Sequence, residues 1–168
     1  MAADELLLRQ APHSPQAEQA VLGSMLIDPD CIKDVMDKLQ PEDFYLRANR
    51  DIFETIYHMF IYSRPIDGVT VAGEMERNGV YNDNTRDYLV QLMDVTPTSA
   101  NVMEYVKIVL DKSLMRQVAA AAGSITAMVQ EGNGDAGDML ESAEQKVYAI
   151  RRGRSAQNMV TVSMVLQD

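Results

Sequence analysis

The stretch from residue 101 to residue 130 places the strongest constraint on how this 168-residue chain can fold. Apolar side chains recur there at steps of three and four, which puts them on one side of an α-helix. They are Met103, Val106, Leu110, Leu114, Val118, Ala121, Ile125 and Met128. A helix of about thirty residues is about 45 Å long, which exceeds the width of a domain of about 100 residues. We therefore expect one long helix whose far end projects beyond the globule that it leaves.

A short polar turn follows this helix and predicts that the chain doubles back. Residues 131–135 combine two glycines, which suit the end of a helix, with Asp135, which can cap the next one. The return helix is expected over about residues 136–152. A two-helix hairpin cannot bury both of its apolar sides, so it usually packs on a second copy. We therefore predict a homodimer with an interface made by Leu114, Val118, Ala121, Ile125, Met128, Leu140, Ala143 and Val147.

Prolines and capping residues divide the first hundred residues into shorter helices. Ser14 before Pro15 and Asp28 before Pro29 each place a capping residue ahead of a proline at the first helical position. Further helices are expected over the apolar stretch at 49–62 and from about residues 67–70 and 84–85. No stretch has the strand signals needed for a sheet. The predicted fold class is all-α, a compact bundle of about five to six helices followed by a long antiparallel helical hairpin.

These patterns predict four segments along the chain. Residues 1–12 form an N-terminal arm, residues 13–97 a globular helical subdomain, and residues 98–152 the dimerising hairpin. Charge and a glycine at Arg151, Arg152 and Gly153 predict the end of the return helix. Residues 153–168 are then the start of a linker to a further domain.

Composition and motifs argue against chemistry within the chain. The 25 acidic and 15 basic residues give a formal charge of −10, which repels a phosphate backbone. The sequence contains no Gly-x-x-x-x-Gly-Lys-Ser/Thr phosphate-binding loop. His13 and His58 are not at metal-ligand spacing, and His58 is expected to pack within its helix. Cys31 is the only cysteine, which suits a reducing cytoplasm. We expect no catalytic, cofactor-binding or metal-binding residue, and no membrane span.

Short motifs resemble those of the DnaB-type replicative DNA helicases. The segment from His13 to Gly23, His-Ser-Pro-Gln-Ala-Glu-Gln-Ala-Val-Leu-Gly, is similar to the opening helix of that family. Other motifs follow in the family's order and spacing: Pro41-Glu42-Asp43-Phe44-Tyr45, Ile52-Phe53, Pro65-Ile66-Asp67, Tyr88-Leu89 and Pro97-Thr98-Ser99-Ala100-Asn101. The sequence departs from the family at Asn49, where histidine is frequent, and at 84–87, where a glycine pair is usual. The resemblance covers nearly the whole chain.

The resemblance implies a function for each segment. It implies an N-terminal collar that mediates helicase oligomerisation, with three dimers above a hexameric motor that unwinds duplex DNA using ATP and Mg²⁺. Residues 153–168 would begin the linker to that ATPase motor domain. In the primosome the collar receives the C-terminal helicase-binding domain of primase, at positions that match Tyr88, Arg116 and Ile125. A helicase loader is a further expected partner, and single-stranded DNA is contacted only through the parent protein.

Two other classes of function fit the sequence less well. A stand-alone helical DNA-binding regulator needs a basic recognition helix, which an acidic chain without a clustered Lys/Arg face does not offer. A small helical enzyme needs convergent catalytic groups. For Tyr88 and Ile125 packing is an alternative to docking, because both also fit apolar stripes.

Overall fold

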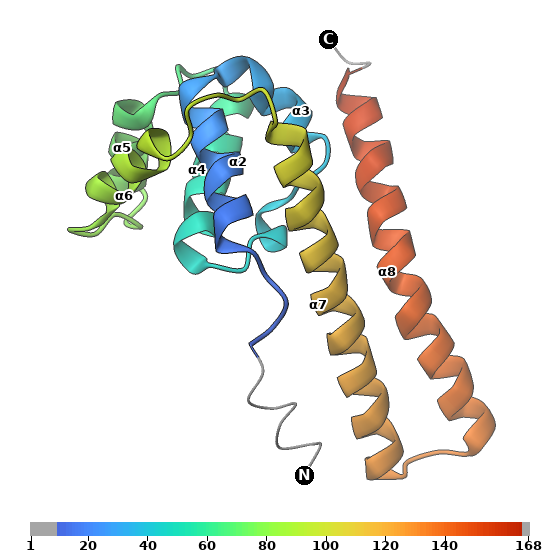
Figure 1. Ribbon diagram of the computed structural model, residues 1–168. Helices are drawn as coiled ribbons and strands as arrows, with labels where there is room; N and C mark the ends of the chain where they lie inside the picture. Colours follow the sequence, from blue (N-terminus) through green and yellow to red (C-terminus); the bar gives the residue numbers. More distant parts are fainter. Residues whose placement is uncertain (1–9, 166–168) are drawn as a thin grey trace. The chain divides into compact units, whose positions relative to one another are not determined.

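The computed structural model describes residues 10–165, with side chains described through residue 153. Within this range the chain is helical and contains no strand, which confirms the all-α prediction. Figure 1 shows the elements α2 (Pro15–Ile27), η1 (Pro29–Cys31), α3 (Ile32–Met36), η2 (Pro41–Asp43), α4 (Arg47–Ile61), α5 (Gly68–Arg77), α6 (Thr85–Asp94), α7 (Val102–Glu131) and α8 (Ala136–Val165). The described residues form two compact units: residues 13–113, and residues 114–165 together with residues 10–12.

The predicted capping residues begin the helices of the first unit. The Ser14 side chain accepts a hydrogen bond from a backbone N–H in the first turn of α2, and Asp67 does the same for α5. Asp28 also caps, but it begins the 3₁₀ turn η1, which continues directly into the short helix α3. Local sequence chemistry therefore sets where these helices start.

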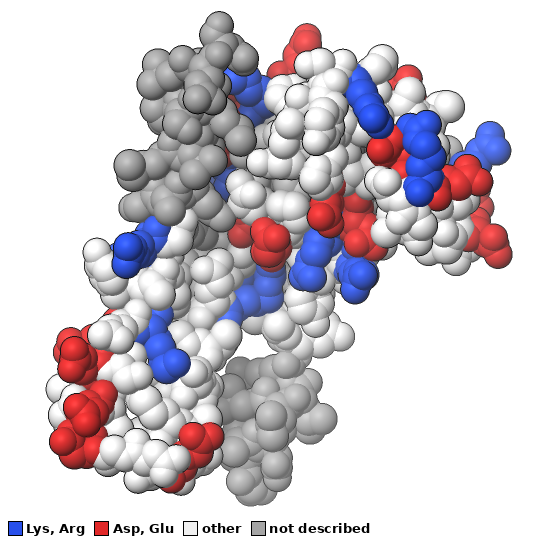
Figure 2. Space-filling model, turned by 180° about the vertical axis from the view of Figure 1, so that it is seen from behind, with Lys and Arg blue, Asp and Glu red and all other residues white. Residues whose placement is uncertain are grey.

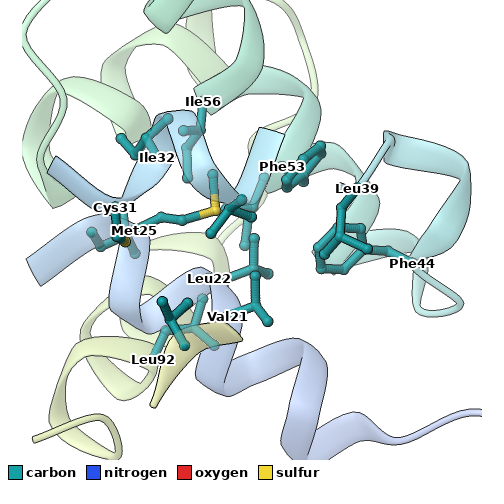
Figure 3. Packing of buried hydrophobic residues seen from close by; sticks show 14 of the residues in the cluster. Val21, Leu22, Met25, Cys31, Ile32, Leu39, Phe44, Phe53, Ile56 and Leu92 are labelled. Carbon is teal, nitrogen blue, oxygen red and sulfur yellow. The ribbon is translucent and has the colours of Figure 1, made fainter. Parts of the chain in front are cut away.

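The core of residues 13–113 lies where α2 meets α3, α4 and α6. Figure 3 shows its side chains converging, and those with no exposed surface include Val21, Leu22, Met25, Ile32, Leu39, Phe44, Phe53, Ile56 and Leu92. Full burial of one such side chain contributes about 1.5–3 kcal/mol. The expected central helix at 49–62 is α4, and it supplies part of this core.

Gly23 allows α2 and α6 to approach closely. A Cβ atom at this position would lie 2.1 Å from Thr96 Oγ1 and 2.3 Å from the Leu92 carbonyl oxygen. Both distances are far shorter than real Cβ contacts. Only glycine fits at this crossing, which explains a small residue in the middle of a buried helix.

The long helix and the turn after it match the prediction. α7 covers Val102–Glu131, and Gly132 and Gly134 adopt positive φ angles of 66° and 126° in the turn. The expected boundary after residue 97 differs from the structure, in which the units divide between Ser113 and Leu114. The reason is that the first half of α7 is part of the globule, with Ser113 buried there.

The return helix is longer than predicted. It does not end at Arg152 but passes through Gly153 and reaches Val165. One glycine inside a helix costs only about 1 kcal/mol, and the arginines around it are good helix formers. The predictions for residues 1–9 and 166–168 lie outside the described part of the chain.

Candidate interaction surfaces

Each helix of the hairpin carries a row of half-buried side chains. On α7 the row contains Leu114, Ala121, Ile125 and Met128, and on α8 it contains Met139, Ala143, Lys146 and Ile150. Both rows follow steps of three, four or seven residues, so each occupies one side of its helix. α7 and α8 run in opposite directions from the turn (Figure 1). We assign these rows to the contact between the two helices, because each is the most covered side of its helix.

A second row on each helix is apolar and open to solvent. On α7 it contains Met115, Val118, Ala122 and Val129, and on α8 it contains Leu140 and Val147. The exposed fractions of Val118, Leu140 and Val147 are 54%, 63% and 56%. Isolated exposed apolar residues are common on proteins, but rows at helical spacing usually mark an interface.

The two exposed rows lie on the same side of the hairpin. Successive residues of an α-helix are rotated by about 100°, so on each helix the exposed row lies roughly a quarter turn from the half-buried row. The rotation has the same sense on both helices when each is viewed from its own N-terminus. Because the helices are antiparallel, equal rotations bring both exposed rows to one face, which we call the hairpin face. It is defined by Met115, Val118, Ala122, Val129, Leu140 and Val147.

The eight residues predicted for the dimer interface divide between these two kinds of row. Val118, Leu140 and Val147 lie on the exposed hairpin face, and the other five are half-buried. A helix in a four-helix bundle contacts two neighbours on two adjacent sides, which is the pattern that both helices show. The role of the eight residues in dimerisation stays a prediction.

The three residues predicted for primase docking lie in both units. Tyr88 belongs to the globule, is half-buried, and donates its hydroxyl hydrogen bond to Asn49 Oδ1. Burial is the main cause that raises the pKa of Tyr88 above its ordinary value. Arg116 Nη1 donates to the Pro12 carbonyl at 2.8 Å, and Ile125 lies on the half-buried row of α7. Tyr88 and Arg116 thus have internal contacts, and their docking role stays a prediction.

A buried carboxylate that the sequence did not reveal joins α2 to the start of α4. Glu18 is only 2% exposed, and its oxygens accept hydrogen bonds from Tyr45 N at 2.6 Å, Leu46 N at 3.3 Å and Asn49 Nδ2 at 2.8 Å. Asn49 in turn accepts from Tyr88, so the network reaches α6. α4 has no side-chain cap of its own, and Glu18 supplies one from another helix. The available signal was an acidic residue inside an otherwise apolar helix.

A shallow groove of about 440 Å³ lies beside α4 and α5 and has a mainly polar rim. Two of its carboxylates are paired with arginines: Glu74 Oε2 lies 2.8 Å from Arg64 Nη1, and Asp51 Oδ1 lies 3.4 Å from Arg47 Nε. The prediction that His58 packs inside its helix is wrong, because its side chain faces solvent. Its position on α4 is opposite the buried row, so the neighbouring aromatic residues do not enclose it.

The remaining chemical groups form no reaction centre among residues 10–153. Burial is the main cause that raises the pKa of Cys31 to about 11, so its thiol stays protonated at neutral pH. No group of three His, Cys, Asp or Glu side chains lies close enough to hold a metal ion in this part of the chain. None of the described helices has the length and apolar character needed to cross a bilayer.

The chain is similar in sequence to one known protein family and to whole proteins that contain its domain. Residues 10–111 match the family described as DnaB-like helicase N terminal domain. The chain is 34% identical over 165 residues to the replicative DNA helicase DnaB of Mycobacterium leprae (strain TN), covering 95% of this chain and 27% of that protein. It is 32% identical over 149 residues to the DnaB of Pasteurella multocida (strain Pm70), covering 88% and 32%. The chain thus spans about a third or less of these relatives.

Solved structures show the same fold. The crystal structure of the N-terminal domain of DnaB helicase from Mycobacterium tuberculosis matches with a TM-score of 0.76 and 35% identity, covering 84% of this chain and 99% of that one. The N-terminal domain of DnaB helicase from Helicobacter pylori, described with its interactions with primase, matches with a TM-score of 0.60 and 24% identity, covering 68% and 89%. The second match shows the fold alone.

Proposed function

Because the chain belongs to the family of DnaB-like helicase N-terminal domains, we propose that it forms the collar of a replicative DNA helicase and that two copies pair through the hairpin face. The observation that carries this proposal is the apolar row that each helix of the hairpin leaves exposed on the same side. A second hairpin placed on that face completes a four-helix bundle and covers both rows. Three such pairs would form the collar of a hexamer.

The uncharged stretch of α7 supports a second copy as the occupant of this face. Residues 117–130 contain no Asp, Glu, Lys or Arg, although most of them are exposed. The solvent-facing side of a helix usually carries charged or polar residues, so an exposed segment without charge over several turns is unusual for a surface that stays in water. Interfaces between copies of one chain are more apolar than ordinary surface, and this composition fits them.

Sedimentation equilibrium tests the pairing. We expect the full chain to gain mass toward a dimer as its concentration rises, and Val118→Asp to shift that equilibrium toward monomer by at least tenfold. Ala127→Asp is the matched control, because Ala127 is exposed on another side of α7 and should leave the equilibrium unchanged. A wild-type chain that stays monomeric at high concentration contradicts the proposal.

We further propose that the collar receives the C-terminal domain of primase, with Tyr88, Arg116 and Ile125 as contact residues. The family membership supports this partner, and the related Helicobacter pylori domain was described with its interactions with primase. Each of the three side chains keeps part of its surface open to solvent. The hydrogen bonds of Tyr88 and Arg116 hold these two side chains in place, which lowers the entropy lost on binding.

Calorimetric titration with the primase C-terminal domain tests this second step. We expect Tyr88→Ala to weaken binding about tenfold or more, in the range of a strong interface residue. Tyr62→Ala is the matched control, because Tyr62 is a more exposed tyrosine of the same unit outside the proposed contact. Equal effects of both substitutions, or no complex with the wild type, would rule out the assignment.

The remaining activity belongs to the parent protein. We propose that a motor domain outside this chain binds ATP and Mg²⁺, holds single-stranded DNA and unwinds the duplex in the cytoplasm, and that a helicase loader is a further partner. The acidic composition of the chain supports this division, because a net charge of −10 repels the phosphate backbone of DNA. A gel-shift titration of the chain with single-stranded DNA should show no complex at physiological salt, and a stable complex would contradict this division.

A further inference from the structure

The dipeptide Asn-Gly occurs twice in the sequence, and the fold holds the two occurrences differently. Asn78-Gly79 directly follows α5, and Asn133-Gly134 lies in the turn between α7 and α8 (Figure 1). All four residues are exposed. Both glycines have positive φ angles, 73° for Gly79 and 126° for Gly134, which glycine adopts readily. The two sites therefore have the same chemical groups and differ in what the backbone around them does.

An asparagine followed by glycine has a route to lose its side-chain amide without an enzyme. The backbone nitrogen of the glycine attacks Cγ of the asparagine, and the new C–N bond closes a succinimide ring. The side-chain amide nitrogen leaves as ammonia and takes the proton of the attacking N–H. Water then opens the ring at either carbonyl, which gives aspartate, or isoaspartate when the main chain continues through the side-chain carboxyl. Glycine favours ring closure because it has no Cβ to shield its nitrogen or to restrict rotation.

The backbone at the end of α5 opposes this reaction at Asn78. The Gly79 N–H donates to the Glu76 carbonyl at 3.2 Å, and the Val80 N–H donates to the Met75 carbonyl at 3.0 Å. Ring closure needs the glycine nitrogen and Cβ of the asparagine to eclipse each other about the Cα–C bond, because both atoms belong to the ring. Asn78 has ψ −1°, at which the nitrogen of Gly79 eclipses the backbone nitrogen of Asn78 instead. The reaction therefore requires a rotation that breaks these hydrogen bonds.

The hairpin turn places no such restraint on Asn133. Among the described residues, the Gly134 N–H donates no backbone hydrogen bond, and neither Asn133 nor Gly134 belongs to a helix. The next hydrogen bonds involve Asp135, whose Oδ1 accepts from Asp138 N at 2.8 Å and whose carbonyl accepts from Met139 N at 3.1 Å. These bonds begin α8 and lie beyond the peptide that must rotate.

We infer that Asn133 is a site of spontaneous deamidation in the folded chain, whereas the fold protects Asn78. Breaking the two backbone hydrogen bonds at the end of α5 should slow the reaction at Asn78 about tenfold or more relative to Asn133. The inference depends neither on the proposed pairing nor on primase docking, because the reaction needs only the chain and water. The chain then gains aspartate or isoaspartate at residue 133 as it ages.

Deamidation changes the hairpin turn in two ways. Either product adds a carboxylate between Glu131 and Asp135, at the end of the hairpin where Figure 2 shows acidic side chains gathered. Isoaspartate also adds a methylene group to the main chain, which alters the path that brings Asp135 to the start of α8. Because Asp135 caps that helix, its displacement destabilises the first turn of α8. The modified position therefore lies where it affects the return of the chain.

Peptide mass spectrometry of the aged chain tests the inference. The full chain is kept at neutral pH and physiological temperature, and the deamidated fraction at each site is followed over time. We expect Asn133 to deamidate at least about tenfold faster than Asn78 in the folded chain. The two rates should converge when guanidinium chloride unfolds the chain. Equal rates in the folded chain, no loss at Asn133, or a difference that persists after unfolding would overturn the inference.

Enzymatic labelling of isoaspartate gives an independent readout. A protein-isoaspartate methyltransferase with labelled S-adenosylmethionine should label the hairpin-turn peptide of the aged chain. Asn133→Gln should abolish this label, because the longer side chain must close a larger ring. Asn78→Gln is the matched control, an exposed asparagine before glycine whose substitution should leave the label unchanged. A label that persists in Asn133→Gln, or that disappears in Asn78→Gln, would contradict the assignment.

Discussion

The globule of residues 13–113 and the hairpin formed by the rest of α7 and by α8 differ in how much of their apolar side chains they expose to solvent. In the globule the apolar side chains of several helices meet, and Phe44, Phe53 and Leu22 have no exposed surface. In the hairpin Val118, Leu140 and Val147 expose more than half of theirs. The globule therefore has a core that stabilises it as a single chain, whereas the hairpin leaves apolar side chains exposed to solvent. Substitutions that separate folding from association can test this difference.

The largest expected effect is on the free energy of unfolding, for a core substitution compared with a substitution on the hairpin face. Phe53→Ala should lower the free energy of unfolding of the globule by about 3–5 kcal/mol, because it leaves a cavity beside Phe44. Val118→Ala should change it by less than about 0.5 kcal/mol, because its side chain is largely exposed. Urea unfolding followed by tyrosine fluorescence measures both, since every tyrosine except Tyr148 lies within residues 13–113. Similar losses for the two variants would erase the distinction between the regions.

A second comparison uses one acidic residue from each region. Glu18→Ala should destabilise the globule by about 3 kcal/mol, because it leaves the donors of Tyr45, Leu46 and Asn49 without their acceptor. Glu144→Ala should leave the unfolding of the globule unchanged, because Glu144 is exposed on α8. The urea midpoint is the readout. A Glu18→Ala variant with wild-type stability would show that the buried network is not needed.

Two helical glycines sharpen the contrast further. Gly23→Ala should cost about 1–3 kcal/mol, since its Cβ would overlap Thr96 and the Leu92 carbonyl. Gly123→Ala should instead stabilise α7 by about 0.5–1 kcal/mol, because no atom lies within 4 Å of its added Cβ. Thermal unfolding by circular dichroism measures both signs. A stabilising Gly23→Ala would mean that α2 and α6 do not approach closely.

The last expected effect concerns the cap of α5 and depends on pH. The pKa of Asp67 is lowered chiefly because the Thr70 N–H donates to its carboxylate. A lowered folded pKa gives stability that is present above the unfolded value of about 3.9 and is lost as pH falls through the folded value. Asp67→Ala should thus cost about 1 kcal/mol at pH 7 and less at acid pH. Asp67→Asn, which keeps an acceptor, should show a smaller, pH-independent loss. A cost of Asp67→Ala that does not change with pH would contradict this role.

The sequence predicted what local patterns encode and missed what depends on distant contacts. The caps at Ser14 and Asp28 and the turn glycines were predictable, because each acts on residues within one turn. The burial of Glu18 was not, because its donors lie 27 to 31 residues away along the chain. The continuation of α8 past Gly153 was missed because a local signal for a break was outweighed by good helix formers on both sides.

The candidate surface was predicted only in part for the same reason. Helical spacing identified the apolar residues of the hairpin, but it did not separate the side that faces the neighbouring helix from the side left exposed. That separation requires knowing where the second helix lies.

Hydrogen exchange at several protein concentrations tests most directly whether a second copy covers the hairpin. We predict that amides of residues 115–129 become more protected as the concentration rises, because association adds stability only to the paired state. Amides of α2 and α4 should exchange at a rate independent of concentration. Protection of the hairpin that does not change over the range in which the globule is fully folded would contradict the account.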